Sequence, residues 1–183
     1  MLHIGLTGGI GTGKSTVAAM LTKRGAYVQD YDELAHFVVE PGKPAWQDIV
    51  DYFGQEILRE DRFLDRPKLA KVVFADTEKR RKLQSFIYPR LGEEYSRRIQ
   101  EIVEKDPNAI IVADVPLLIE TGMKAMFEKI ILVYATREQQ LERLMARDGM
   151  EREEALKRLD AQMPIDEKVK FADYVVHNTG SIE

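Results

Sequence analysis

A glycine-rich segment near the start of the chain constrains its fold more than any other feature. A strand-like run at residues 3–7 leads into Gly8, Gly13, Lys14 and Ser15, which have the G-x-x-x-x-G-K-[ST] spacing of a phosphate-binding loop. Glycines let backbone amides curl toward phosphate oxygens, and the helical pattern that follows adds the positive end of a helix dipole. We therefore expect a nucleotide at this loop.

Two side chains of the loop have roles that this spacing predicts. Lys14 can reach the outer phosphates, and the Ser15 hydroxyl can bind Mg²⁺. ATP and Mg²⁺ are therefore the expected cofactors. The alternative is a glycine-rich turn that binds nothing, but strand, loop and helix follow in the order that the motif requires.

Length and composition indicate one globular α/β unit. The chain has 183 residues, 44% of them hydrophobic, which is enough for a full core. Its net charge of −4 argues against nucleic acid as the source of the bound phosphates. It has no cysteine, and no apolar run reaches membrane-spanning length. Because the first strand starts at residue 2 and leaves no room for a signal peptide, we expect a cytoplasmic protein without nucleic-acid or membrane partners.

Apolar runs and helical patterns alternate along the chain. Four runs after the first are expected to be buried parallel strands, at residues 26–29, 109–113, 129–134 and 174–177. Helices are expected at 14–23, at 32–39, between Pro44 and Gly54, and after Pro89. This alternation predicts a parallel sheet with helical connections.

Two connections are longer than one crossover helix. The helical segment from residue 34 to residue 108 follows the second strand, and a second insertion at about 137–170 follows the fourth. In that insertion, Thr136 and Gln139 have capping-box spacing, and a helix at 151–163 follows a break at Gly149. We expect a core at about 1–33, 109–136 and 171–183, with both insertions serving substrates.

Phosphoryl transfer needs a base for the acceptor hydroxyl, and Asp30 and Asp32 are the first candidates. They follow the second strand, at the edge where parallel sheets place their ligands. In a chain that is still extended, residues two apart point to the same side, so both carboxylates could face one cleft. The alternative is helix capping, because Asp30 and Glu33 also have capping-box spacing.

Further candidates follow the third and fourth strands. Asp114 ends the third strand, where an acidic group can orient Mg²⁺, although it can also be an ordinary polar strand end. Arg143 and Arg147 stand one helical turn apart and can both face a nucleotide, or else belong to a solvated helix face. The basic run at 79–82 is expected to be such a face. The three histidines are too scattered for a metal site or a catalytic triad.

Several motifs together resemble the dephospho-CoA kinase family over nearly the whole chain. The matching segments are residues 4–16 of the loop, the D-x-D pair Asp30 and Asp32, residues 38–42, V-P-L-L-I-E at 115–120, Q-L-x-R-x-x-x-R at 140–147, and residues 172–178. The resemblance implies a P-loop NTPase fold of three α/β/α layers, similar to nucleoside-monophosphate kinases. It also implies a five-stranded parallel sheet, a helical lobe on the CoA side at 34–108 and a lid at 137–170.

The same resemblance assigns functions to residues. It implies that Asp32 accepts the proton of the ribose 3′-hydroxyl of dephospho-CoA, which attacks the γ-phosphate of ATP, with Lys14 and Arg143 as further catalytic residues. The triphosphate site comprises Gly11, Thr12, Gly13, Lys14, Ser15 and Thr16, with Arg143 and Arg147 closing from the lid. Ser15 and Asp114 are the expected Mg²⁺ residues. The acceptor site comprises Asp30, Asp32, Tyr88, Pro116, Leu117 and Glu120. A monomer is expected.

The chain departs from the family pattern at two places. Tyr88-Pro89 stands where the family typically has His-Pro, although a tyrosine can still donate a hydrogen bond. The family usually continues past the position of Glu183 with a further helix, which Ser181 could cap. The remaining alternatives are an adenylate-like or shikimate-like kinase, which V-P-L-L-I-E and D-Y-D match poorly, and a non-catalytic module gated by ATP.

Overall fold

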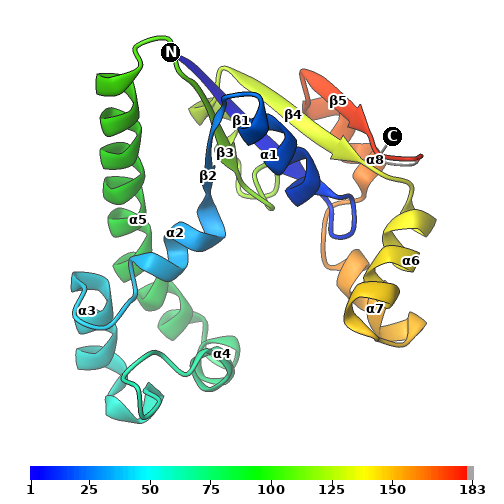
Figure 1. Cartoon of the computed structure of the whole chain (residues 1–183). Helices are drawn as coiled ribbons and strands as arrows, with labels where there is room; N and C mark the ends of the chain where they lie inside the picture. The colour runs from blue at the N-terminus through cyan, green and yellow to red at the C-terminus, as the bar shows by residue number, and fades with distance from the viewer. Residues whose placement is uncertain (181–183) are drawn as a thin grey trace. The chain divides into compact units, whose positions relative to one another are not determined.

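The computed structural model describes residues 1–180, so Ser181 and the helix that it was expected to cap lie outside the described residues. The chain divides into two compact units (Figure 1). The first unit comprises Met1–Asp30 and Lys105–Glu183, and the second is Tyr31–Glu104. The second unit covers most of the segment assigned to the helical lobe.

A five-stranded parallel sheet forms the centre of the first unit. Its strands are β1 (Leu2–Gly8), β2 (Tyr27–Asp30), β3 (Ile110–Asp114), β4 (Lys129–Tyr134) and β5 (Tyr174–His177). They are ordered β2-β3-β1-β4-β5, with every adjacent pair parallel. The sequence predicted β4 and β5 with these bounds, and it placed β2 and β3 one residue too early.

The two outer strands differ from the prediction that all strands are buried. Tyr27 and Asp30 of β2 are exposed, as are Tyr174, Val176 and His177 of β5, whereas β1 and β3 are mostly buried and half of the residues of β4 are buried. The reason is the strand order, because β2 and β5 are the edges of this sheet. An apolar run by itself does not distinguish an edge strand from a central one.

Helices of the first unit extend the core of the sheet. They are α1 (Lys14–Lys23), α6 (Arg137–Asp148), α7 (Arg152–Asp160) and α8 (Ile165–Lys168), with short 3₁₀ turns η2 (Met123–Met126) and η3 (Val169–Phe171). Ala18 of α1 packs against Ile4, Leu6, Val112 and Val133 from three adjacent strands. Helix α1 thereby covers one face of the sheet at β1, directly after the glycine-rich loop (Figure 1).

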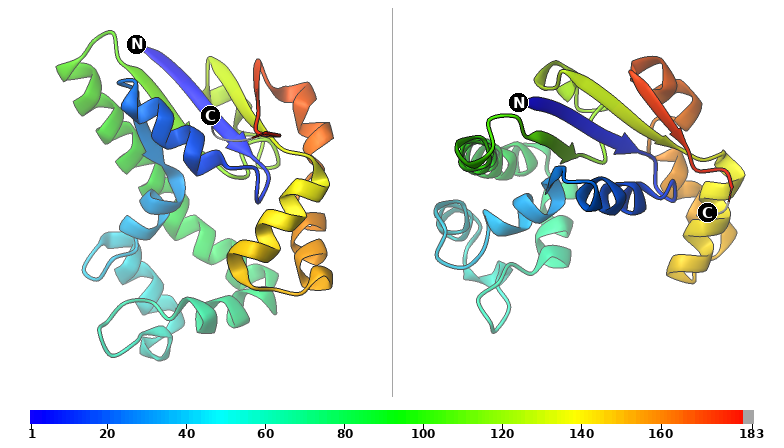
Figure 2. Two further views of the ribbon diagram at one scale, coloured as in Figure 1. Left: turned by 45° about the vertical axis from the view of Figure 1, so that its right-hand side comes forward. Right: turned by 45° about the horizontal axis from the view of Figure 1, so that its top comes forward.

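Helices α6 and α7 form the insertion after β4 and lie side by side (Figure 2). Leu141 and Leu144 of α6 pack against Ala155 and Leu159 of α7. The predicted capping box at Thr136 is confirmed, because the Thr136 hydroxyl accepts from the Gln139 N–H and the Gln139 side chain accepts from the Thr136 N–H. The helix predicted at 151–163 is shorter than expected and ends at Asp160.

The second unit is helical. Its elements are α2 (Tyr31–Phe37), α3 (Pro44–Phe53), η1 (Gln55–Ile57), α4 (Arg66–Phe74) and α5 (Thr77–Lys105). Apolar side chains of α3 and α4 form its core, with Trp46, Ile49, Phe53, Leu69 and Val73 all buried. Leu83, Phe86 and Ile87 of α5 pack against this cluster. Pro44 and Gly54 bracket α3 as the sequence predicted.

Helix α5 corrects the expectation that a helix starts after Pro89. It runs through Pro89 as one helix of 29 residues. An internal proline removes one backbone hydrogen bond and costs roughly 3 kcal/mol in a helix interior. Apolar residues on both sides of it, Ile87 and Leu91, pack on the same core cluster, which offsets that cost. Among the described residues, no helix is both long and apolar enough to cross a membrane.

Candidate active site

The glycine-rich loop connects β1 to α1 and curls as the motif predicts. Gly11 and Gly13 have φ angles of 75° and 86°, in the left-handed region that favours glycine. The buried Thr12 donates its hydroxyl to the Gly9 carbonyl, 2.8 Å away, and the Thr16 N–H donates to the Gly13 carbonyl, 3.0 Å away. Because α1 begins at Lys14, the amides of its first turn lie at this loop, as an anion site requires.

Other parts of the first unit lie close against the loop. A Cβ on Gly11 would lie 2.7 Å from the main-chain oxygen of Gln140, and a Cβ on Gly13 would clash with the side-chain amide of Asn178. That amide donates to the Thr12 carbonyl at 2.9 Å. The loop glycines are therefore required both for the backbone conformation and for the close approach of α6 and the end of β5.

Both main-chain polar groups of Ile10 are bound by glutamine side chains. The Ile10 N–H donates to Gln162 Oε1 at 2.9 Å, and the Ile10 carbonyl accepts from Gln140 Nε2 at 2.7 Å. Gln140 is only 3% exposed. Sequence reasoning missed both contacts, although a glutamine in line with Leu144 on the apolar face of α6 was a signal, because buried polar side chains have hydrogen-bond partners.

Lys14 and Asp114 form an ion pair at the carboxyl edge of the sheet. Asp114 is the last residue of β3 and is 4% exposed, and in the adjacent strand Asp30 is its register partner. The predicted loop lysine and the predicted metal residue are therefore brought together. The Asp114 carboxylate orients the Lys14 ammonium at the loop.

The side chains at this edge of the sheet have the oxygen donors that Mg²⁺ prefers. The exposed Ser15 hydroxyl and the Asp114 carboxylate are oxygen donors, which Mg²⁺ prefers. Within residues 1–180, no three His, Cys, Asp or Glu side chains gather as a metal-binding group. Mg²⁺ usually keeps several waters and binds one or two protein ligands together with substrate phosphates, so the oxygens of Ser15 and Asp114 are suitable donors for it.

The two predicted lid arginines have different surroundings. Arg143 lies at the loop, where Nη2 donates to the Asn178 carbonyl at 2.9 Å and Nη1 to the Gly11 carbonyl at 3.5 Å. Arg147 instead forms a hydrogen-bonded ion pair with Asp148, with 2.7 Å between Nε and Oδ1, and this contact raises the pKa of Arg147. The structure thus brings only Arg143 to the loop backbone.

In the second unit, Asp32 is the second residue of helix α2. The expectation that Asp30 and Asp32 share one side of an extended segment is wrong, because β2 ends at Asp30 and the helix begins at Tyr31. A helix turns by about 100° per residue, so the period of two that relates side chains in a strand does not hold there. Asp32 instead shares a helix face with His36, one turn later.

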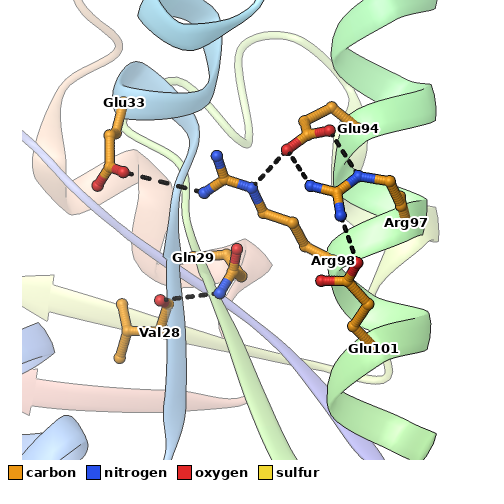
Figure 3. Close-up of polar contacts among 7 residues, drawn as sticks. All are labelled: Val28, Gln29, Glu33, Glu94, Arg97, Arg98 and Glu101. Atoms are coloured by element: carbon orange, nitrogen blue, oxygen red, sulfur yellow. Dashed lines mark hydrogen bonds and ion pairs between the residues drawn. The ribbon is translucent and has the colours of Figure 1, made fainter.

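Helix α2 is bound to helix α5 along its length. The rings of Tyr31 and Tyr95 lie 4.8 Å apart, and burial raises the pKa of the Tyr31 hydroxyl to about 12. The Arg98 guanidinium lies 4.9 Å from the Phe37 ring centroid, and its Nη1 is 3.9 Å from Glu33 Oε1 (Figure 3). Residues before and after Asp32 therefore hold helix α2 against helix α5.

Glu94 holds the arginine of this contact. Its carboxylate accepts from Arg98 Nε at 2.8 Å and from Arg97 at 2.7 Å (Figure 3). The hydrogen bond from Arg97, with support from Arg98, lowers the pKa of Glu94 to about 2. Arg97 also pairs with Glu101, one turn along α5. A charged network thus fixes Arg98 in the orientation that reaches α2.

The other predicted acceptor residues come from both units. Tyr88 is 60% exposed on α5, and its hydroxyl accepts from Gln84 Nε2 at 3.1 Å. Leu117 is exposed, and the Pro116 carbonyl accepts from the Thr7 hydroxyl at 3.2 Å.

Glu120 has a partner that the sequence analysis did not identify. Its Oε1 lies 2.6 Å from Nζ of Lys168, which is fully buried, and also accepts from the Met163 N–H at 3.3 Å. One oxygen of Glu120 therefore stabilises the fold of the insertion after β4.

Comparison with solved structures identifies the class of protein. The fold matches a shikimate kinase from Acinetobacter baumannii with a TM-score of 0.54 at 18% identity, covering 99% of this chain and 86% of that chain. Together with the strand order and the loop between β1 and α1, this likeness defines a parallel α/β fold of the P-loop class.

The family follows from closer relatives. A family model described as dephospho-CoA kinase matches residues 2–183, and the chain belongs to that family. A dephospho-CoA kinase from Syntrophus aciditrophicus is 49% identical over 100% of this chain and 78% of its own length. One from Carboxydothermus hydrogenoformans is 47% identical over 98% and 87%. The structure of a dephospho-CoA kinase from Campylobacter jejuni has a TM-score of 0.70 at 30% identity, covering 98% of this chain and 89% of that one.

Proposed function

We propose that the protein transfers the γ-phosphate of ATP to the ribose 3′-hydroxyl of dephospho-CoA, giving CoA and ADP in the last step of coenzyme A synthesis. The observation that carries this proposal is the match to the dephospho-CoA kinase family over residues 2–183. The phosphate-binding loop between β1 and α1 supports ATP as the phosphate donor.

Asp32 is the proposed base. As the 3′-hydroxyl oxygen forms its bond to the γ-phosphorus, the hydroxyl proton moves to the Asp32 carboxylate, and the bond from the γ-phosphorus to the β,γ-bridging oxygen breaks to release ADP. A positioned base of this kind contributes about 10²–10⁴-fold in rate. The attachment of α2 to α5 supports this role, because a base acts only when it is held within hydrogen-bond reach.

The proposed nucleotide site comprises the loop and the lid helix. The main-chain amides of residues 11–16 bind the phosphates, Lys14 contacts the outer phosphates, and Arg143 offsets charge that develops in the transition state. The position of Arg143 against the Gly11 carbonyl supports this role. Arg147 is proposed to join it by exchanging its contact with Asp148 for the nucleotide.

Mg²⁺ is the proposed metal cofactor, held by the Ser15 hydroxyl and by the Asp114 carboxylate directly or through water. An ion held there would supply positive charge that neutralises the phosphates. The Asp114 carboxylate also keeps the Lys14 ammonium at the loop, which supports a position for both groups next to the outer phosphates.

The remaining assignments rest on family resemblance. Asp30, Tyr88, Pro116, Leu117 and Glu120 are proposed to contact or support dephospho-CoA. A monomer acting in the cytoplasm is proposed because one chain supplies every candidate residue and ATP is a cytoplasmic metabolite.

Mass spectrometry of the products tests the reaction directly. The protein is incubated with Mg²⁺-ATP and dephospho-CoA, and in parallel with AMP or shikimate as acceptor. CoA and ADP are expected with dephospho-CoA alone. If folded protein that binds ATP forms no CoA, the proposed reaction is wrong. ADP formation that requires the acceptor separates a kinase from a module that only binds ATP.

A further inference from the structure

A groove with a volume of about 400 Å³ lies within the helical unit. Its polar lining comes from His36, Glu40, Arg59 and Arg66, and its apolar lining from Val39, Phe63, Leu64 and Pro67. This lining contains two guanidinium groups and an imidazole but one carboxylate, that of Glu40. The groove therefore favours an anion that is attached to a less polar group.

The wall with Arg59 and Phe63 is a tight hairpin. The Arg59 N–H donates to the Phe63 carbonyl at 2.9 Å, and Leu58 pairs with Leu64 as an antiparallel bridge. At its tip, Arg62 has a φ of 66°, and its carbonyl accepts from Nε1 of the buried Trp46 at 2.9 Å. This anchoring to the core gives the groove a preformed wall.

The opposite walls connect the groove to Asp32. His36 lines it from α2, one helical turn after Asp32 on the same helix face. Arg66 lines it as the first residue of α4, a helix capped by the Asp65 carboxylate, which accepts from the Lys68 N–H at 3.0 Å. Burial lowers the pKa of Arg66 and the charge of Asp32 opposes that shift, so the two charges interact.

The two arginines are not equivalent. Arg59 already pairs with Asp61, with 3.0 Å between Nη2 and Oδ2. Arg66 also lines the groove, and its pKa is influenced by the charge of Asp32, the proposed base. A planar guanidinium suits two phosphate oxygens at once.

We propose that this groove binds the diphosphate of dephospho-CoA, with Arg66 as its main contact and Arg59 as a second. The inference rests on the proposed function and extends it to a specific acceptor site. The diphosphate of dephospho-CoA is attached to the 5′ position of the ribose whose 3′-hydroxyl reacts, so a cation near Asp32 is placed to bind it. The apolar residues Val39, Phe63, Leu64 and Pro67 then contact the organic part of the acceptor beside the diphosphate.

Calorimetric titration of dephospho-CoA into the full chain without nucleotide tests this site. Arg66→Ala is expected to raise the Kd about 10- to 100-fold, since a charge-assisted contact is lost. Arg66→Lys retains the charge without the planar fork and should fall between wild type and Arg66→Ala. Lys68→Ala is the matched control, because it removes one positive charge from the same helix but does not line the groove. Its Kd should stay within about twofold of wild type.

Steady-state kinetics distinguish diphosphate binding from an effect on the base. The proposal requires Arg66→Ala to raise the KM for dephospho-CoA while kcat at saturation stays within about threefold, because ground-state binding is lost. An unchanged Kd with a lower kcat and a shifted pH profile would mean that Arg66 acts only on Asp32, and would overturn the inference. If wild type binds and converts dephospho-CoA and Arg66→Ala binds it equally well, the groove assignment alone is wrong. If wild type converts none, the proposed function is wrong as well. Should Arg66→Ala fail to fold, Arg66→Lys and Arg59→Ala provide the same comparison.

Discussion

The side-chain amide of Gln140 donates a hydrogen bond to the main-chain carbonyl of Ile10, with 2.7 Å between Nε2 and O. The two residues are 130 positions apart, and the bond joins the lid helix α6 to the phosphate-binding loop. Because Gln162 binds the N–H of the same residue, the loop backbone at Ile10 is fixed from two sides of the lid insertion. The shape of the glycine-rich loop therefore depends on the fold of the insertion after β4.

Replacing Gln140 with alanine should weaken both the fold and nucleotide binding. The change leaves the partly buried Ile10 carbonyl without this partner, which costs roughly 1–3 kcal/mol of unfolding free energy. ATP affinity should fall as well, because the loop loses a constraint on its binding shape. Urea unfolding and ATP titration measure the two effects. Gln100→Ala, an exposed change on α5, should alter neither. An ATP affinity equal to wild type would show that the loop keeps its shape without Gln140.

Asp32→Asn should lower kcat by about 10²-fold or more and leave ATP affinity nearly unchanged, because the lost carboxylate acts on the acceptor hydroxyl. Steady-state kinetics with both substrates varied measure this split. Asp51→Asn removes an acidic group on α3 and is the control. Ordinary turnover in Asp32→Asn would exclude Asp32 as the base.

Lys14→Ala should weaken nucleotide binding and turnover together, since its charge contacts the phosphates. The variant should also lose roughly 1–3 kcal/mol of stability, because the buried Asp114 carboxylate loses its ammonium partner. Adding Asp114→Asn should recover part of the stability without recovering turnover. Thermal unfolding and kinetics of both variants check this. Unaltered ATP binding and turnover in Lys14→Ala would contradict the loop assignment.

Arg98→Ala should raise the KM for dephospho-CoA or lower kcat, with the KM for ATP unchanged, because α2 loses its contacts through Glu33 and Phe37. Arg97→Ala is the matched control, since Arg97 also binds Glu94 but its ion pairs, with Glu94 and Glu101, lie within α5. Arg98→Lys keeps the charge and should retain part of the activity. Equal effects of Arg97→Ala and Arg98→Ala would mean that the network supports only α5.

The pH dependence of stability should reveal the Glu94 network. The folded protein holds the pKa of Glu94 at about 2, below its ordinary value of about 4.5, because Arg97 and then Arg98 donate to the carboxylate. A lowered pKa contributes stability above the unfolded value, and this contribution is lost as pH falls from about 4.5 to about 2. In the Glu94→Gln variant, the free energy of unfolding should therefore change less than in wild type as pH falls from about 4.5 to about 2. A variant with the same pH profile as wild type would show that Glu94 does not contribute it.

Patterns within short segments determined the nucleotide loop and much of the sheet. The spacing of Gly8, Gly13, Lys14 and Ser15 encodes a local backbone shape, and the structure has a left-handed Gly13 directly before α1. The bounds of β4 and β5 and the Thr136 capping box were also predictable, because a short apolar run and the cap spacing are patterns of a few neighbouring residues.

Tertiary contacts decided the rest, because they join residues far apart in the chain. The pair of Lys14 with Asp114 spans 100 positions, and the bond of Gln162 to Ile10 spans 152. Helix α5 continues through Pro89 because core packing on both sides of the proline outweighs its local cost. The sequence by itself therefore determined the position and backbone shape of the glycine-rich loop. Only the folded chain decided which side chains hold the loop and the Asp32 helix in place, since such contacts depend on burial that no local pattern specifies.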